Sequence, residues 1–182
     1  MTNGRNAILA VGVAIVVIVA AFGVYLAAAK SPSTGKVSIM VKDLPDDWTH
    51  VNVTFSQVRI HQASTGNESE SNESGWHNLA IAQKTIDLAV LVNVSELLAS
   101  ANVGPGKYTQ IRLVIDSVIG TMEDGTVVNF TVPSGELKTT HPFNVTAGQT
   151  TTLTLDFILE DSIVHNSQGW KFKPVLGPII QS

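Results

Sequence analysis

The chain of 182 residues contains no cysteine. Disulfide bonds therefore cannot stabilise it, and cysteine nucleophiles and cysteine zinc ligands are excluded. Charged residues are also scarce, at 14% of the sequence, and the formal net charge is −4 at pH 7. A weakly acidic chain of this kind does not favour nucleic acid or anionic lipid as a partner. The fold must depend on its hydrophobic core, and we expect attached sugars to supply solubility that charge does not.

The sequence motifs of common enzyme classes are absent as well. There is no G-x-S-x-G, no H-E-x-x-H, no phosphate-binding glycine loop and no EF-hand spacing. The histidines are scattered over separate predicted elements, so a zinc site would require the fold to bring them together. They are His50, His61, His77, His141 and His165. We therefore expect a protein that is not an enzyme and carries no cofactor, calcium excepted.

One long apolar run is present. Residues 7–29 contain no charged side chain, and a helix of this length spans about 35 Å, enough to cross a hydrocarbon core of about 30 Å. We expect residues 1–6 to form a short cytoplasmic N-terminus, 7–29 a single-pass transmembrane signal-anchor helix, 30–36 a linker and 37–182 an extracytoplasmic domain at the cell membrane. A cleaved signal peptide is the alternative, because Ala27-Ala28-Ala29 has the small-x-small pattern of a cleavage site.

Six of the eleven asparagines lie in Asn-x-Ser/Thr sequons, and all six follow the apolar run. They are Asn52, Asn67, Asn72, Asn93, Asn129 and Asn144. This distribution favours a domain outside the cell that is N-glycosylated. In an organism without that pathway, the same residues are ordinary polar side chains on solvated strands.

Apolar and polar residues alternate with period two through most of the chain after residue 36, which predicts half-buried antiparallel strands. The alternation slips at Ser56-Gln57 and predicts a β-bulge there. Asp124-Gly125 predicts a hairpin. One short helix is expected over residues 96–101, with Ser95 as its N-cap. About eight or nine strands favour an all-β fold, a two-sheet antiparallel β-sandwich of the Ig-like or transthyretin-like kind.

An acidic turn is a candidate metal site. Asp43, Asp46 and Asp47 lie close together in the sequence, and several carboxylates at one loop tip suit calcium. Glu160-Asp161 would add ligands if that turn lies nearby. The alternative is ordinary turn chemistry, in which aspartates beside Pro45 cap backbone amides.

The three tryptophans are a candidate carbohydrate platform. Trp48, Trp76 and Trp170 each offer an aromatic face that complements the C–H face of a pyranose ring. No run of aromatic residues lies on one strand face, so packing in the core or at its rim is the alternative interpretation.

Several segments, in order along the chain, resemble the family named domain of unknown function 4382. The most distinctive are Gly104-Pro105-Gly106 before Tyr108 and Lys173-Pro174-Val175, and Gly35-Lys36-Val37-Ser38 marks the start. The resemblance covers essentially the whole predicted domain. It implies a β-sandwich on secreted or membrane-anchored archaeal and bacterial proteins, with no established activity or catalytic residues. The apolar tail 176–182 is not explained by that pattern.

These observations favour a non-enzymatic, membrane-anchored, glycosylated cell-surface module with a structural, adhesive or ligand-binding role. Its partners would be surface polysaccharide, other envelope proteins or copies of itself. A second interpretation is a subunit of an extracellular filament or surface assembly, in which the tail 176–180 or a freed N-terminal segment completes a neighbour's sheet. A third is a calcium-dependent binding domain that uses the acidic turn.

Overall fold

The computed structural model describes residues 32–43, 48–63, 75–92 and 94–182. Residues 34–182 belong to one compact unit. The predicted anchor 7–29 lies outside the described residues, as do Asp46, Asp47, Asn67, Asn72 and Asn93. Within the described ranges, no helix has the length and hydrophobicity needed to cross a membrane.

The described residues are mostly β-structure, as the alternation predicts. The strands are β1 (Gly35–Asp43), β2 (Trp48–Gln62), β3 (Trp76–Ile81), β4 (Thr85–Asp87), β5 (Glu96–Val103), β6 (Gly106–Met122), β7 (Val127–Phe130), β8 (Glu136–Thr139), β9 (Phe143–Val145), β10 (Thr150–Phe157), β11 (Ile163–Asn166), β12 (Gly169–Phe172) and β13 (Ile180–Gln181). Two short helical segments accompany them, the 3-10 helix η1 (Leu88–Val90) and α2 (Leu159–Ser162).

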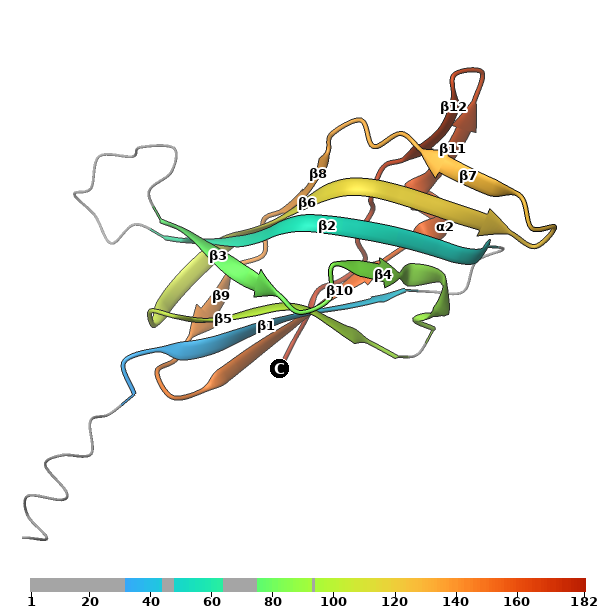
Figure 1. The fold of residues 1–182 in the computed structure, drawn as a ribbon. Helices are drawn as coiled ribbons and strands as arrows, with labels where there is room; N and C mark the ends of the chain where they lie inside the picture. The colour runs from blue at the N-terminus through green and yellow to red at the C-terminus, as the bar shows by residue number, and fades with distance from the viewer. Residues whose placement is uncertain (1–31, 44–47, 64–74, 93) are drawn as a thin grey trace, which may run out of the picture. The chain divides into compact units, whose positions relative to one another are not determined.

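Eleven strands form one continuous sheet that folds over on itself at β3. The order is β13-β10-β1-β5-β3-β2-β6-β7, with β4 beside β2 and with β8 and β9 beside β6. The first residues of β3 pair with β2, whereas Ala80 and Ile81 pair with β5. Strand β3 thus joins a layer built on β2 and β6 to a layer built on β1, β5 and β10, in a sandwich-like arrangement (Figure 1). Strands β11 and β12 form a separate two-stranded ribbon.

Alternate residues of the long strands fill the space between the layers. In β2, Val53, Phe55, Val58 and Ile60 are fully buried. The register against β6 shifts on both sides of Phe55, which confirms the bulge predicted at Ser56-Gln57. The extra residue restores the alternation, so that the apolar side chains on both sides of the bulge point into the same core.

Residues 96–101 form part of strand β5, and the predicted helix is wrong. Ser95 precedes a strand and therefore does not cap a helix. The segment pairs with β1 from Glu96 to Val103 and with β3 through Ala99 and Ser100. A helix of six residues makes too few internal hydrogen bonds to offset its nucleation cost. Pairing with β1 along the segment, and with β3 at Ala99 and Ser100, offers the same backbone hydrogen-bond partners, and tertiary pairing therefore decides its conformation.

The prediction of a purely antiparallel sandwich is also wrong at one pair. Strands β1 and β10 are parallel, in register from Lys36 opposite Thr150 to Asp43 opposite Phe157. Alternation determines which face a side chain takes, but it carries no information on the direction of the neighbouring strand. A parallel pair needs a long crossover, and the chain between β1 and β10 supplies it.

The apolar tail lies on the domain's own sheet. Strand β13 pairs antiparallel with β10, with Ile180 opposite Thr154, and Leu176 bridges Phe157. The amide of Gly177 donates to the carbonyl of Asp156 over 2.8 Å. The tail thus covers part of an edge of β10 that would otherwise present unpaired backbone groups.

Tyr108 makes the domain less stable as the pH rises in the alkaline range. Its side chain is buried and stacks on Phe143, and its hydroxyl donates to the carbonyl of Gly104 over 2.9 Å. Burial raises the pKa of Tyr108 above its usual value. The folded state therefore favours the neutral phenol. That contribution is complete below the unfolded pKa of about 10 and is lost as pH rises through the folded pKa.

Urea unfolding between pH 8 and 11 checks this expectation. We expect the parent chain to lose stability over this range more steeply than Tyr108→Phe, which cannot ionise. At pH 8 the substitution itself should cost about 1 kcal/mol through the lost hydrogen bond. Parallel pH profiles for the two chains would show that Tyr108 does not carry the effect.

Candidate ligand-binding site

Two of the three tryptophans meet at one end of the β2–β6 layer. Trp48 begins β2 and lies 5.4 Å from Trp170 of β12, ring centre to ring centre, with the ring planes nearly perpendicular. Phe130 of β7 lies 5.2 Å from Trp48 and 6.2 Å from Trp170. The β11–β12 ribbon reaches this position because Thr131, just after β7, exchanges backbone hydrogen bonds with Trp170 and Phe172.

Gly120 allows this aromatic cluster to form. A Cβ atom at Gly120 would lie 2.6 Å from the ring of Trp48 and 2.7 Å from the ring of Phe130. Both rings thus pack against the backbone of β6 where a side chain would otherwise stand. A glycine inside a strand is the sequence signal for such a close approach, and the sequence-based interpretation missed it.

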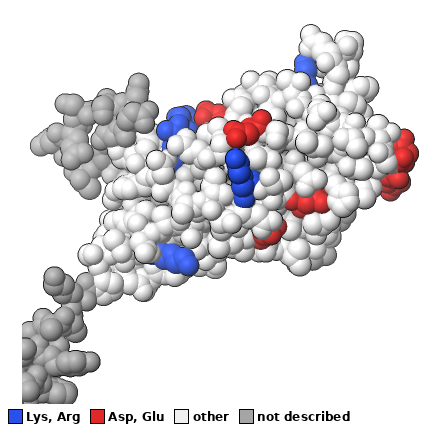
Figure 2. All heavy atoms as spheres, viewed as in Figure 1, with Lys and Arg blue, Asp and Glu red and all other residues white. Residues whose placement is uncertain are grey.

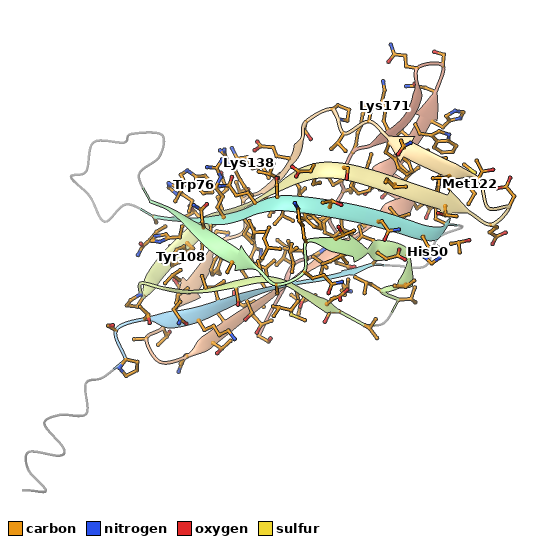
Figure 3. The ribbon with its side chains drawn as sticks, in the orientation of Figure 1. His50, Trp76, Tyr108, Met122, Lys138 and Lys171 are labelled. Atoms are coloured by element: carbon orange, nitrogen blue, oxygen red, sulfur yellow. The ribbon has the colours of Figure 1, made fainter. Side chains whose placement is uncertain are left out.

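The cluster borders an open depression of about 380 Å³. Its walls are Trp48, Trp170 and Met122, and the β6–β7 hairpin adds Glu123 and Asp124. The hairpin itself was predicted from Asp124-Gly125 and is confirmed, with Gly125 at a positive φ. Figure 3 labels Met122, which ends β6 and lines the depression, and Lys171, which follows Trp170 in β12.

The polar side of the depression is negatively charged. The amide of Thr126 donates to the Asp124 carboxylate over 2.9 Å, and this hydrogen bond lowers the pKa of Asp124. Glu123 is exposed beside it. One side of Trp170 is covered, because His165 stacks on it at 4.2 Å with an angle of 20° between the rings. The depression therefore combines apolar walls with hydrogen-bond acceptors, an arrangement suited to a neutral ligand rich in hydroxyl groups.

Trp76 does not join this cluster, so the three tryptophans do not form a single platform. It begins β3, where its ring lies 4.9 Å from that of His61. The guanidinium groups of Arg59 and Arg112 lie 5.1 Å and 4.6 Å from its ring centre. The alternation of each strand predicts which face a tryptophan occupies, but the strand order that separates Trp76 from Trp48 is a tertiary property.

Of the acidic turn proposed for calcium, the structure describes only Asp43. This side chain is 2% exposed, and its carboxylate accepts a hydrogen bond of 3.3 Å from the amide of Leu159. The Glu160-Asp161 turn lies next to Asp43, which was the condition for it to add calcium ligands. Both of its carboxylates, however, are exposed on α2. No group of three metal-binding side chains occurs among the described residues. Asp43 acts here as an acceptor for a backbone amide.

The described sequons differ in their accessibility. Asn129 on β7 and Asn144 on β9 are exposed, as the alternation predicts. Asn52 is half-buried, because it lies in β2 with Asp87 of β4 on one side and Ile119 of β6 on the other. Exposure on a strand face is compatible with glycan attachment at Asn129 and Asn144, and less so at Asn52.

The fold and the depression define an all-β, sandwich-like domain with an aromatic surface site. The profile of the family described as domain of unknown function 4382 matches residues 34–174, and the chain belongs to this family. No curated protein and no solved structure gives a significant match. The match ends before the tail, so the segment that covers β10 lies outside the family pattern.

Proposed function

We propose that this chain is a non-enzymatic cell-surface module that binds neutral carbohydrate in the depression between Trp48 and Trp170. It is held at the membrane by residues 7–29, with a β-sandwich domain on the outside that carries N-linked glycans. The observation that carries the proposal is the pairing of aromatic walls with the carboxylates of Glu123 and Asp124 around one opening.

The chemistry of the depression favours a neutral sugar over an acidic one. Aromatic surfaces gain free energy from contact with the C–H face of a pyranose, and carboxylates accept hydrogen bonds from its hydroxyl groups. The carboxylate of an acidic sugar would be repelled by the carboxylates of Glu123 and Asp124. Because His165 covers one side of Trp170, Trp48 and the uncovered parts of Trp170 would supply the apolar contact.

The proposed location is supported by the sequence and by the surface. The apolar run is long enough to span a bilayer, and all sequons follow it. Asn129 of β7 and Asn144 of β9 are exposed, whereas their neighbours in each strand are buried in the core. Figure 2 shows that charged side chains are sparse on the face in view, which is consistent with glycans contributing to solubility.

Titration of the full chain in detergent with neutral glucan, mannan and chitin oligosaccharides tests the binding site. We expect at least one of them to shift the tryptophan fluorescence, and Trp48→Leu to weaken binding about tenfold, since aromatic contacts of this kind are worth about 1 kcal/mol or more. Trp76→Leu is the matched control and should bind as the parent does. If none of the three oligosaccharide classes binds, or if Trp48→Leu and Trp76→Leu lose affinity equally, the assignment of this site is refuted.

Protease shaving of intact cells tests the location, together with the intact mass of the membrane-extracted protein. Added protease should digest the domain, and the mass should exceed that of the full-length polypeptide by glycan increments. Survival of the domain under conditions that remove a known surface protein would reverse the orientation. A mass that corresponds to cleavage after Ala29 would identify a signal peptide in place of an anchor.

A further inference from the structure

The depression between Trp48 and Trp170 carries charge of one sign. Among the described residues that line it, only Glu123 and Asp124 are charged, and both are exposed. Figure 2 shows acidic side chains at the end of the layer where Figure 1 places the β6–β7 hairpin. The formal net charge of the whole chain, −4, has the same sign. The electrostatic field that would repel an acidic sugar therefore attracts a cation.

The lysine of the neighbouring ribbon does not neutralise these carboxylates. Lys171 follows Trp170 in β12, and successive side chains of a strand point to opposite faces. Its ammonium group donates to the side-chain oxygen of Gln168 over 2.6 Å, in the turn between β11 and β12. Neither Glu123 nor Asp124 forms an ion pair with a residue that the structure describes. Their charge is thus available to a ligand.

The aromatic walls of the depression have the geometry of a cation site. The ring planes of Trp48 and Trp170 stand at 88° to each other with their centres 5.4 Å apart, so the two rings form a corner and not a stack. A cation is attracted to the face of an aromatic ring, most strongly to that of tryptophan, and aromatic cages bind quaternary ammonium groups in this way. Met122 adds a polarisable thioether to the same lining.

A different tryptophan of this chain already has cations on its ring. The guanidinium groups of Arg59 and Arg112 lie 5.1 Å and 4.6 Å from the ring centre of Trp76. By contrast, neither Trp48 nor Trp170 has a cation–π partner within the described part of the chain. An external cation would therefore find its aromatic contact in the depression and not at Trp76.

We propose that the depression binds a small quaternary ammonium compound of the choline type, a class of ligand beyond the neutral sugars proposed above. Its trimethylammonium group lies against Trp48 and Trp170, and Glu123 and Asp124 supply the opposite charge. A strongly hydrated cation gains less from an apolar corner, because it loses more of its hydration there. A phosphocholine group is disfavoured, since the same carboxylates repel its phosphate. The inference concerns the site proposed for sugars, but it rests on charge and ring geometry and does not require that sugars bind.

Titration of the full chain with choline tests this inference, in a polyoxyethylene detergent that carries neither sugar nor choline. Sodium chloride keeps the ionic strength constant, so that a response to choline is not a response to salt. Saturation-transfer NMR should show the choline methyl protons in contact with the protein. Choline should bind about tenfold more tightly than its uncharged analogue, in which a tert-butyl group replaces the trimethylammonium group. Phosphocholine should bind more weakly than choline.

A double variant removes the charge of the depression and keeps its shape. Glu123→Gln with Asp124→Asn retains the hydrogen-bond acceptors, and Asn-Gly suits a hairpin turn as well as Asp-Gly does. Choline binding should weaken about tenfold in this variant, and also in Trp48→Leu. Asp116→Asn is the matched control and should bind choline as the parent does, since it removes an exposed carboxylate about 20 Å along β6 from Met122. Urea unfolding of each variant checks that it is folded.

Equal binding of choline and its tert-butyl analogue would overturn the inference, because the depression would then recognise apolar shape alone. The inference is equally wrong if the folded parent does not bind choline, if the double variant binds it unchanged, or if phosphocholine binds as tightly. Neutral oligosaccharides should bind the double variant nearly as well as the parent, since its amides still accept hydrogen bonds. Failure with choline therefore leaves sugar binding intact, and failure with oligosaccharides leaves choline binding intact, so the two proposals are tested separately.

Discussion

Deletion of residues 176–182 is expected to cost about 3 kcal/mol of the free energy of unfolding and to leave a monomer that melts several degrees lower. The tail pairs with β10 through Ile180 and Gln181 and bridges Phe157 through Leu176. Leu176 and Ile179 also pack partly buried against the core. The truncation exposes this apolar surface and leaves an edge of β10 without its hydrogen-bond partners.

Two adjacent isoleucines provide a matched control for the tail. Ile179 packs against the core, whereas Ile180 is 51% exposed. Ile179→Ala should therefore lower the urea midpoint clearly more than Ile180→Ala, since both remove the same atoms. A truncated chain with unchanged stability that no longer self-associates would contradict the intramolecular role. It would favour the strand-donating assembly subunit instead, because the lost contacts would then have been between molecules.

Replacement of Gly35 by alanine is expected to destabilise the domain by about 1–3 kcal/mol through overpacking. An added Cβ would lie 2.6 Å from a methyl group of Val145 and still nearer the backbone oxygen of Thr146. That oxygen cannot move aside cheaply, because it accepts a hydrogen bond from the amide of Gln149 in the turn before β10. The amide of Lys36 is bonded to the same turn, so β1 cannot withdraw from it either.

Gly104 provides the control for this substitution. No heavy atom lies within 4 Å of a Cβ built there, and its φ is not in the left-handed region. Gly104→Ala should therefore leave the thermal midpoint unchanged or raise it slightly, since alanine reduces the entropy of the unfolded chain. Equal losses in both variants would show that the close approach of β1 to the turn is not what requires glycine at residue 35.

Local sequence patterns predicted much of the β-structure. The bulge at Ser56-Gln57 and the hairpin at Asp124-Gly125 are both present. These features were predictable because each depends on a few consecutive residues: the parity of buried side chains in one strand, or the need for a positive φ in one turn. The family membership was predictable for the same reason, since the residues that carry it occur in short segments.

The candidate sites were only partly predictable. The sequence singled out Trp48 and Trp170, but the ring contacts that unite them and leave out Trp76 depend on the ribbon β11–β12 docking beside β7. The close approach of Trp48 and Phe130 to Gly120 was not predicted at all.

The sequence by itself determined the all-β class, the buried face of the alternating strands and the family, because these follow from composition, periodicity and short motifs. Tertiary structure alone decided that residues 96–101 form a strand, that β1 runs parallel to β10, and that the tail lies on β10. These properties depend on which backbone groups find partners across the sheet. Several pairings satisfy the same alternation equally well, and only the packing of the whole domain selects among them.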